Sequence, residues 1–239
     1  MTSDRDGGHG GPLVFWSPVR AGRAEDVPEG ERARWGSYRR QADRDRMATA
    51  AALRRAVLRL VGVPSPVLVR RCGGCGSLGH GGVHARDGAG RTWAMSTSHA
   101  ADVVMVALVP PSAHGAPAIG VDVEEVDRVR ADALHVACTR AERLILAAGT
   151  ARAADLWTAK EAVLKAAGCG LHLSPVHADL AGRLRGDVWR TGGLETLLAH
   201  PRGTLIAWRD AGIGRPDLVA TCFVDGPDGP ADPPVLLAA

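Results

Sequence analysis

Lysine is almost absent from this sequence. Its 239 residues include 29 basic side chains, of which only Lys160 and Lys165 are lysine and all the others are arginine. Both lysines fall in one short stretch, "DLWTAKEAVLKAAGCGL", which also contains Glu161. The formal net charge of +3 is too small to indicate a protein that coats nucleic acid. The question is why an arginine-rich chain keeps two ammonium groups beside one carboxylate.

Other absences narrow the class of protein. No apolar run is long enough to span a bilayer, and the polar start "MTSDRDGGHGG" lacks the apolar core of a signal peptide. We therefore expect a cytoplasmic protein that uses neither membrane nor nucleic acid as its partner. The five cysteines are an odd and scattered set, which in a reducing compartment predicts thiols. The phosphate-loop, dinucleotide-binding and serine-hydrolase glycine motifs are missing, so those interpretations have no support.

The order of expected elements predicts an α+β protein of two similar lobes, a pseudo-dimer in which each lobe is a small, mostly antiparallel sheet packed with helices. Apolar periodicity predicts a helix over 31–61, and alternating or apolar runs predict strands at 67–71, 92–99 and 102–109. In the second half we expect a strand at 118–126, helices at 133–148 and 155–171, and strands at 204–210 and 218–224. The predicted divisions are a disordered leader 1–12, an N-terminal lobe 13–112, a C-terminal lobe 113–225 with a metal site, and a flexible tail 226–239. Two lobes in one chain make a monomer sufficient.

The segment "IGVDVEEV" places two carboxylates on one side of a strand. Alternate residues of a strand share a face, so Asp122 and Glu124 point the same way. Two carboxylates near a strand end suit Mg²⁺, which takes oxygen ligands from protein, water and substrate phosphates. A solvated polar face is the alternative interpretation.

The lysine-bearing helix adds a third carboxylate and an ammonium. Glu161 and Lys165 are four residues apart and share a face. A surface ion pair would explain the charges but not the choice of lysine, since arginine would serve equally well there. A compact ammonium can lie against a phosphate and give up a proton, which arginine cannot do. Together with Asp122 and Glu124, this set suits metal-assisted phosphoryl chemistry.

Two further clusters could bind an anion. Ser98 and His99 follow an apolar strand and could both donate to a phosphate, although a strand end without a task explains them equally well. The stretch "ERARWGSYRRQADRDR" could be a solvated helix start or a cradle for an anionic ligand. Its two aromatic residues, Trp35 and Tyr38, would suit an adenine ring.

A single C-x-x-C pair, Cys72 and Cys75, is weak support for zinc. A structural zinc site needs four ligands, so His80 and His84 would have to complete the set.

At this point the motifs resemble those of a known family. "IGVDVEEV" followed by "WTAKEAVLKAAGCGL" closely resembles the two signature motifs of the 4′-phosphopantetheinyl transferases, with the large two-lobed type that activates peptide and polyketide synthases as the better match. "STSHA" resembles that family's Ser-His motif, residues 31–63 resemble its arginine-rich N-terminal helix, and the loop from Cys72 is similar to one in actinobacterial members. The resemblance covers about residues 30 to 225.

The resemblance implies a reaction and a role for each matching residue. Phosphopantetheine would move from coenzyme A to a serine of an acyl- or peptidyl-carrier protein, releasing 3′,5′-ADP. Asp122, Glu124 and Glu161 would hold Mg²⁺, and Glu161 would also act as base for the carrier serine. Lys165 would stabilise the leaving phosphate. The coenzyme contacts would come from Ser98, His99, Arg46 and Arg34 at the 3′-phosphate, and from Lys160 at the other phosphates.

The sequence departs from the family pattern at three places. Ala100 stands where a second serine is common, Gly82 where a basic residue helps to hold coenzyme A, and Cys138 where phenylalanine is common; Glu142 matches an acidic position. Two other interpretations remain open. One is a Mg²⁺-dependent nuclease, and the other is a pseudoenzyme that binds coenzyme A or a carrier protein without catalysis.

Overall fold

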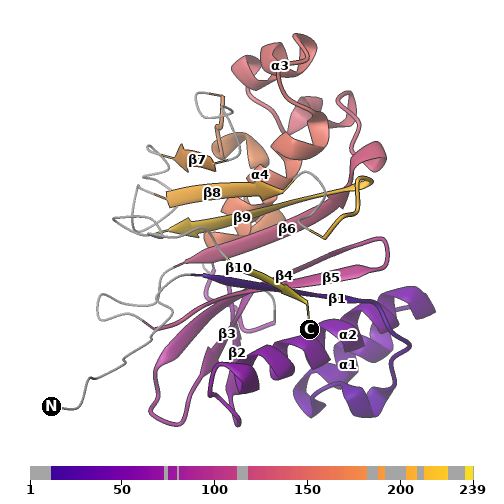
Figure 1. Cartoon of the computed structure of the whole chain (residues 1–239), viewed down its shortest axis with the longest axis vertical. Coiled ribbons are helices and arrows are strands. Elements are labelled where there is room, and N and C mark those ends of the chain that lie inside the picture. The colour runs from indigo at the N-terminus through magenta and orange to yellow at the C-terminus, as the bar shows by residue number, and fades with distance from the viewer. Residues whose placement is uncertain are drawn as a thin grey trace, which may run out of the picture.

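Two β-sheets and four α-helices make up the described part of the chain. The computed structural model describes residues 12–72, 75–79, 81–111, 118–181, 188–191, 203–208, 213–225 and 235–238. A six-stranded sheet has the order β10-β1-β5-β4-β3-β2, and a four-stranded sheet has the order β6-β9-β8-β7 (Figure 1). The fold is therefore α+β with mostly antiparallel sheets, as predicted. The resemblance of the two halves as repeated lobes remains a prediction.

The elements have the following bounds. The strands are β1 (Leu13–Pro18), β2 (Val67–Arg71), β3 (Gly82–Arg86), β4 (Thr92–Ala100), β5 (Val103–Val109), β6 (Ile119–Glu125), β7 (Val188–Thr191), β8 (Gly203–Trp208), β9 (Leu218–Asp225) and β10 (Val235–Ala238). The helices are α1 (Glu29–Ser37), α2 (Gln41–Leu60), α3 (Arg140–Ala147) and α4 (Ala153–Ala166), with short 3₁₀ turns at Ala24–Asp26, Val126–Arg128, Ala133–Val136, Gly170–His172 and Pro175–His177. None of the described helices is long and apolar enough to cross a membrane.

Helix α2 covers one face of the six-stranded sheet (Figure 1). Its apolar residues Leu53, Val57 and Leu58 pack in one cluster with Trp93 and Met95 of β4. Because side chains alternate along a strand, the neighbouring residues of β4 face the other way, toward the second sheet. The two faces of β4 therefore belong to two different environments.

The two sheets share a core. Buried residues of β4 and β5 pack in one cluster with buried residues of β6 and β9, including Met105, Val121, Val123 and Ala220. On the second sheet's other side, α4 packs through Leu156, Ala159 and Val163 together with Phe223 of β9. Strand β6 thus lies between the first sheet and α4, which positions its polar residues beside both.

Gly120 explains how closely β6 and α4 approach. A Cβ atom at this position would overlap the carbonyl oxygen of Ala162, a helix backbone atom. Only glycine leaves room for this contact. The close approach brings the next strand residues beside the polar face of α4.

The predicted element pattern needs three corrections. The helix expected over 31–61 is two helices, because Tyr38 and Arg40 are extended and the indole of Trp35 donates to the carbonyl of Arg44 across the bend. Strands β1, β3 and β7 were not predicted. The chain end was also predicted to be a flexible tail, but Val235–Ala238 pair in parallel with β1. The predicted leader, residues 1–12, lies outside the described residues except for its last one.

Candidate active site

A three-residue network connects the two sheets and α4. The hydroxyl of Ser98 on β4 donates to Oδ1 of Asp122 on β6 over 2.7 Å. The ammonium of Lys165 on α4 lies 2.5 Å from the same oxygen and 2.9 Å from the Ser98 oxygen. Lys165 also donates to the Val121 carbonyl over 3.3 Å. Asp122 is buried, so this ammonium supplies the counter-charge that water cannot.

Two more carboxylates lie within electrostatic reach of Asp122. Burial, followed by the charge of Asp122, raises the pKa of Glu124 to about 7. Burial also raises the pKa of Glu161 to about 7; Lys165 opposes this shift, while Asp122 and Glu124 add to it. Three carboxylates facing one ammonium make a site with an unbalanced negative charge.

This donor set fits a divalent cation. Oδ2 of Asp122 is buried and has no hydrogen-bond partner, although a buried carboxylate oxygen normally has one. Its second oxygen is thus available to a hard cation, which prefers carboxylate ligands. Among the described residues, however, no three carboxylate, imidazole or thiol groups already converge at metal-binding distances. Glu124 and Glu161 would have to turn toward Asp122 for a metal to bind.

A cleft of about 550 Å³ leads to this network. It opens because β3 pairs with β4 only at Thr92–Ala94, so the later residues of β4 have no β3 neighbour. Arg34, Tyr38, Thr97, His99 and Lys165 line it, together with glycines of the segments 79–82 and 168–170. The cleft therefore combines an aromatic ring, basic groups and the ammonium of the network, which suits an anionic, ring-containing ligand.

The structure separates Ser98 from His99. The two were predicted to grip one phosphate together, but consecutive strand residues point to opposite faces. His99 lines the cleft, whereas Ser98 is buried and donates to Asp122. In this arrangement the hydroxyl of Ser98 orients Asp122, and its contact with a phosphate stays a prediction. Ser96, which was not predicted, has a similar position and accepts from the Val121 amide over 3.0 Å.

The two predicted arginines differ in position. Arg34 lines the cleft, but Arg46 does not. The Arg46 guanidinium donates to the Ala101 carbonyl over 3.1 and 3.2 Å and pairs with Asp43. It still lies near His99. Desolvation of the ring lowers the pKa of that imidazole, and the charge of Arg46 lowers it further. Arg46 is at the edge of the site rather than in it.

The predicted role of Lys160 needs correction. It was expected to face coenzyme phosphates, but its side chain is completely buried. The ammonium donates to the carbonyls of Pro175 and Ala178 over 2.9 and 2.7 Å, and lies 2.8 Å from Oε1 of Glu142. The residue therefore ties the segment after α4 and helix α3 to α4. A helical pattern could not show this, because the residues that cover Lys160 come from elsewhere in the chain.

Trp157 is a site residue that sequence reasoning overlooked. Its side chain lies close to the Glu124 carboxylate and opposes the rise of the Glu124 pKa. Trp157 begins the motif that contains Lys160 and Glu161, so its place in the motif was the available signal.

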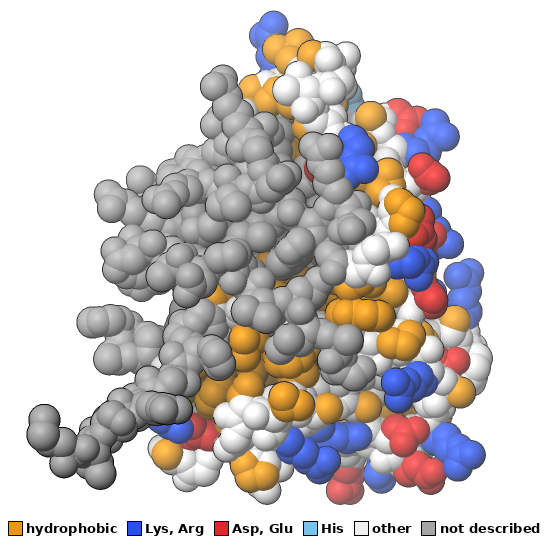
Figure 2. Space-filling view, in the orientation of Figure 1, with side chains coloured by type: hydrophobic (Ala, Val, Ile, Leu, Met, Phe, Trp, Pro, Cys, Tyr) orange, Lys and Arg blue, Asp and Glu red, His pale blue; other side chains and the backbone are white. Residues whose placement is uncertain are grey.

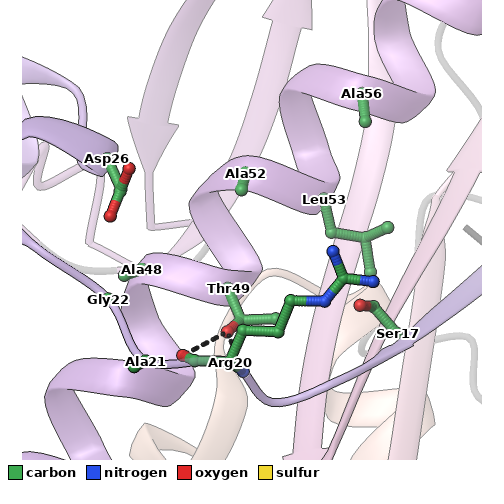
Figure 3. A pocket seen from close by; sticks show the side chains of 10 residues that line it. All are labelled: Ser17, Arg20, Ala21, Gly22, Asp26, Ala48, Thr49, Ala52, Leu53 and Ala56. Atoms are coloured by element: carbon green, nitrogen blue, oxygen red, sulfur yellow. Dashed lines mark hydrogen bonds between the residues drawn. The ribbon is translucent and has the colours of Figure 1, made fainter.

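A smaller hollow of about 280 Å³ lies between α2 and the segment that follows β1 (Figure 3). The Arg20 amide donates to Oγ1 of Thr49 there over 3.0 Å, and alanines of α2 form much of the wall. No predicted site residue lines this hollow, so the larger cleft is the better candidate. On the face shown in Figure 2, basic and acidic side chains are intermixed rather than separated by sign.

The fold and site together define a class: an α+β protein in which acidic residues of a strand meet a glutamate and a lysine of a packed helix. The model of the 4′-phosphopantetheinyl transferase superfamily matches residues 118–208, which contain Asp122, Glu124, Glu161 and Lys165. No curated protein matches the chain. The family match supports a phosphopantetheine transferase activity in general. It covers α3, α4 and the strands β6, β7 and β8, but neither β9 nor the first sheet.

Proposed function

We propose that the protein transfers the 4′-phosphopantetheine group from coenzyme A to a serine of an acyl- or peptidyl-carrier protein, with Mg²⁺, and releases 3′,5′-ADP. The observation that carries the proposal is the network of Ser98, Asp122 and Lys165, with Glu124 and Glu161 beside it. It lies at a cleft with basic and aromatic walls, and most of it falls within the segment that matches the transferase superfamily. The carrier proteins would be those of peptide or polyketide synthases, as in antibiotic biosynthesis, and the enzyme would act as a cytoplasmic monomer.

Asp122, Glu124 and Glu161 would hold the metal. When bound, Mg²⁺ neutralises the oxygens of a pyrophosphate and so makes its phosphorus easier to attack. Ser98 keeps Asp122 oriented, and Trp157, which lies close to Glu124, would do the same for that carboxylate. The raised pKa of Glu161 suits a group that accepts a proton near neutral pH.

Proton and charge movements follow from the positions of two side chains. The carboxylate of Glu161 would take the proton of the carrier serine as its oxygen attacks the phosphorus. The ammonium of Lys165 would stabilise the negative charge that grows on the leaving 3′,5′-ADP phosphate. His99 and Arg34 would hold the 3′-phosphate, and the ring of Tyr38 lies in the same cleft for the adenine.

Intact mass spectrometry of an apo carrier protein tests the proposal directly. After incubation with coenzyme A, Mg²⁺ and the enzyme, we expect the carrier to gain the mass of one phosphopantetheine group. The gain should disappear without Mg²⁺ and fall sharply with Glu161→Ala or Lys165→Ala. Glu125→Ala, on the same strand as Asp122 and next to Glu124, is the control and should leave the gain intact.

The same experiment separates the alternatives. A pseudoenzyme would bind coenzyme A, measured by calorimetry, without modifying any of several carriers. A Mg²⁺-dependent nuclease would cleave nucleic acid without coenzyme A. Either result, or the absence of coenzyme A binding, would contradict the proposed function.

A further inference from the structure

Two ligand pairs that have no role in the proposed transfer share one spacing. Cys72 and Cys75 are three residues apart, and so are Cys169 and His172. Pairs of thiol and imidazole groups at this spacing, contributed by two separate turns, are typical of structural zinc sites. The first pair follows β2, and the second follows α4.

The first pair lies on a tight turn. The amide of Gly76 donates to the Cys72 carbonyl over 2.9 Å, and the Cys72 amide donates to the Ser77 carbonyl over 2.8 Å. Gly76 has a φ of 72°, a left-handed conformation that favours glycine. These two bonds hold Cys72 against Gly76 and Ser77, directly beside Cys75.

The second pair also lies on a tight turn. Cys169 precedes the 3₁₀ turn Gly170–His172, and the His172 amide donates to the Cys169 carbonyl over 3.3 Å. Side chains three residues apart in a 3₁₀ turn lie one above the other, so Cys169 and His172 share a side of the turn.

Both turns lie beside the cleft, the first through Gly81. Gly81 packs so closely against the first turn that a Cβ atom there would overlap Cα of Cys72. Gly81 lines one side of the cleft, and Cys169 and His172 line it as well. Burial, followed by the charges of Cys72 and Cys75, raises the pKa of the Cys169 thiol. Three thiols from two distant parts of the chain are thus electrostatic neighbours.

We propose that Cys72, Cys75, Cys169 and His172 bind one zinc ion that joins the loop after β2 to the end of α4. Three thiolates and one imidazole form a complete tetrahedral set for a structural site. The ion would fix the end of the helix that carries Glu161 and Lys165, at the rim of the cleft. Zinc binding is independent of transfer, so it can be tested whether or not the proposed function holds.

Binding requires the side chains to turn. Among the described residues, no three thiol, imidazole or carboxylate groups already converge at metal-binding distances. The Cys169 thiol now donates to the Ala167 carbonyl over 3.4 Å and would exchange this weak bond for the metal. His84 is the strongest alternative for the fourth ligand, because its Nδ1 is buried without a hydrogen-bond partner. His172 is preferred because it shares a turn with Cys169; His80, suggested by the sequence, lies outside the described residues.

The test is the metal content of the full-length protein. Protein stripped with a chelator and reloaded with Zn²⁺ should retain about one zinc per chain after desalting, measured by mass spectrometry of the metal. Replacement with Co²⁺ should give the intense absorption of a tetrahedral site with three thiolates. Cys75→Ser and Cys169→Ser should each lose the retained metal, and His172→Ala should weaken its retention. Circular dichroism verifies that each variant is folded.

Two variants serve as matched controls. Cys138→Ser removes a thiol that lies in a different cluster, and His84→Ala removes the competing imidazole. Both should keep the zinc content of the unmodified protein. Failure of the unmodified protein to retain zinc, or unchanged retention in Cys169→Ser, would overturn the proposal. Loss of zinc in His84→Ala with retention in His172→Ala would overturn the choice of the fourth ligand.

Discussion

The two lysines of the chain differ in what surrounds their ammonium groups. Lys160 is completely buried and paired with the equally buried Glu142, whereas the side chain of Lys165 is 25% exposed and reaches the cleft. The first arrangement fixes three segments of backbone, and the second leaves an ammonium within reach of a ligand. An arginine-rich chain therefore keeps lysine for two separate reasons, of which the sequence suggested only one.

We expect methionine at the two positions to have different effects, one mainly on stability and the other mainly on transfer activity. Lys160→Met leaves Glu142 as a buried charge without its partner, and should lower the free energy of unfolding by about 3–5 kcal/mol. Lys165→Met should cost less stability, because its ammonium is partly exposed, but should reduce transfer about 100-fold or more. Chemical denaturation and the carrier-protein assay measure the two effects.

A double variant is the control for Lys160. Lys160→Met with Glu142→Gln removes both charges and should recover much of the lost stability, since an uncharged pair needs no compensation. If Lys160→Met were as stable as the original protein but unable to bind coenzyme A, Lys160 would be a ligand contact after all.

The raised pKa of Glu161 predicts how stability depends on pH in metal-free protein. The folded-state pKa is about 7, above the ordinary value of 4.5, so the folded protein binds the extra proton. The cost of ionising Glu161 is absent below about pH 4.5, grows as pH rises, and is complete above about pH 7. Glu161→Gln should therefore stabilise the metal-free protein at about pH 8, by about 1–2 kcal/mol, and much less at about pH 5.

Thermal unfolding with and without Mg²⁺ measures this difference. Mg²⁺ should stabilise the original protein at about pH 8 more than it stabilises Glu161→Gln, because the variant lacks one charged ligand. Glu125→Gln is the matched control: it removes a carboxylate from the other face of β6, where Glu125 pairs with Arg128. A gain in Glu161→Gln that is as large at low pH as at high pH would contradict the predicted cause.

At the scale of elements, the contact between β6 and α4 determines the spacing of the site. Gly120→Ala would push a methyl group into the Ala162 carbonyl, which is backbone and cannot move alone. We expect α4 to shift away from β6, with a loss of about 1–3 kcal/mol in unfolding free energy. Because Asp122 and Lys165 lie on these two elements, transfer should fall even at temperatures where the variant is folded.

Gly36→Ala is the control for this substitution. Gly36 lies in α1, and no atom is within 4 Å of the place that an added methyl group would occupy. Alanine should therefore be neutral there or stabilising by about 0.5–1 kcal/mol. Chemical denaturation measures the unfolding free energy of both variants, and the carrier-protein assay measures their transfer activity. Full activity in Gly120→Ala would show that the spacing of the two elements does not limit the chemistry.

Local patterns predicted most of these elements, and their limits have physical causes. The alternation in β6 and the spacing of Glu161 and Lys165 in α4 could be read directly, because each depends only on local geometry. The break between α1 and α2 could not, since Trp35 and Arg44 meet across it. Likewise, residues that touch only through the tertiary fold, such as Glu142 and Lys160, carry no local signal.

At the scale of the molecule, the shared core makes the two sheets depend on each other. Buried residues from both sheets form a single cluster, so neither sheet can bury its inner face alone. The predicted boundary between 112 and 113 thus separates two sequence halves that have a common interior. The site lies across the same junction, because Ser98 comes from the first sheet and Asp122 from the second.

We therefore expect one cooperative unfolding transition, with equal calorimetric and van't Hoff enthalpies. Met105→Ala in β5 and Val123→Ala in β6 should both move this single transition to lower temperature, with the larger cost, about 2–5 kcal/mol, for methionine. Leu60→Ala, at a position that is 74% exposed, is the control and should leave it in place. Two transitions, each sensitive to only one of the core variants, would mean that the sheets fold as independent lobes. A single transition would instead mean that the network of Ser98, Asp122 and Lys165 depends on the whole protein, because these residues lose their geometry when either sheet unfolds.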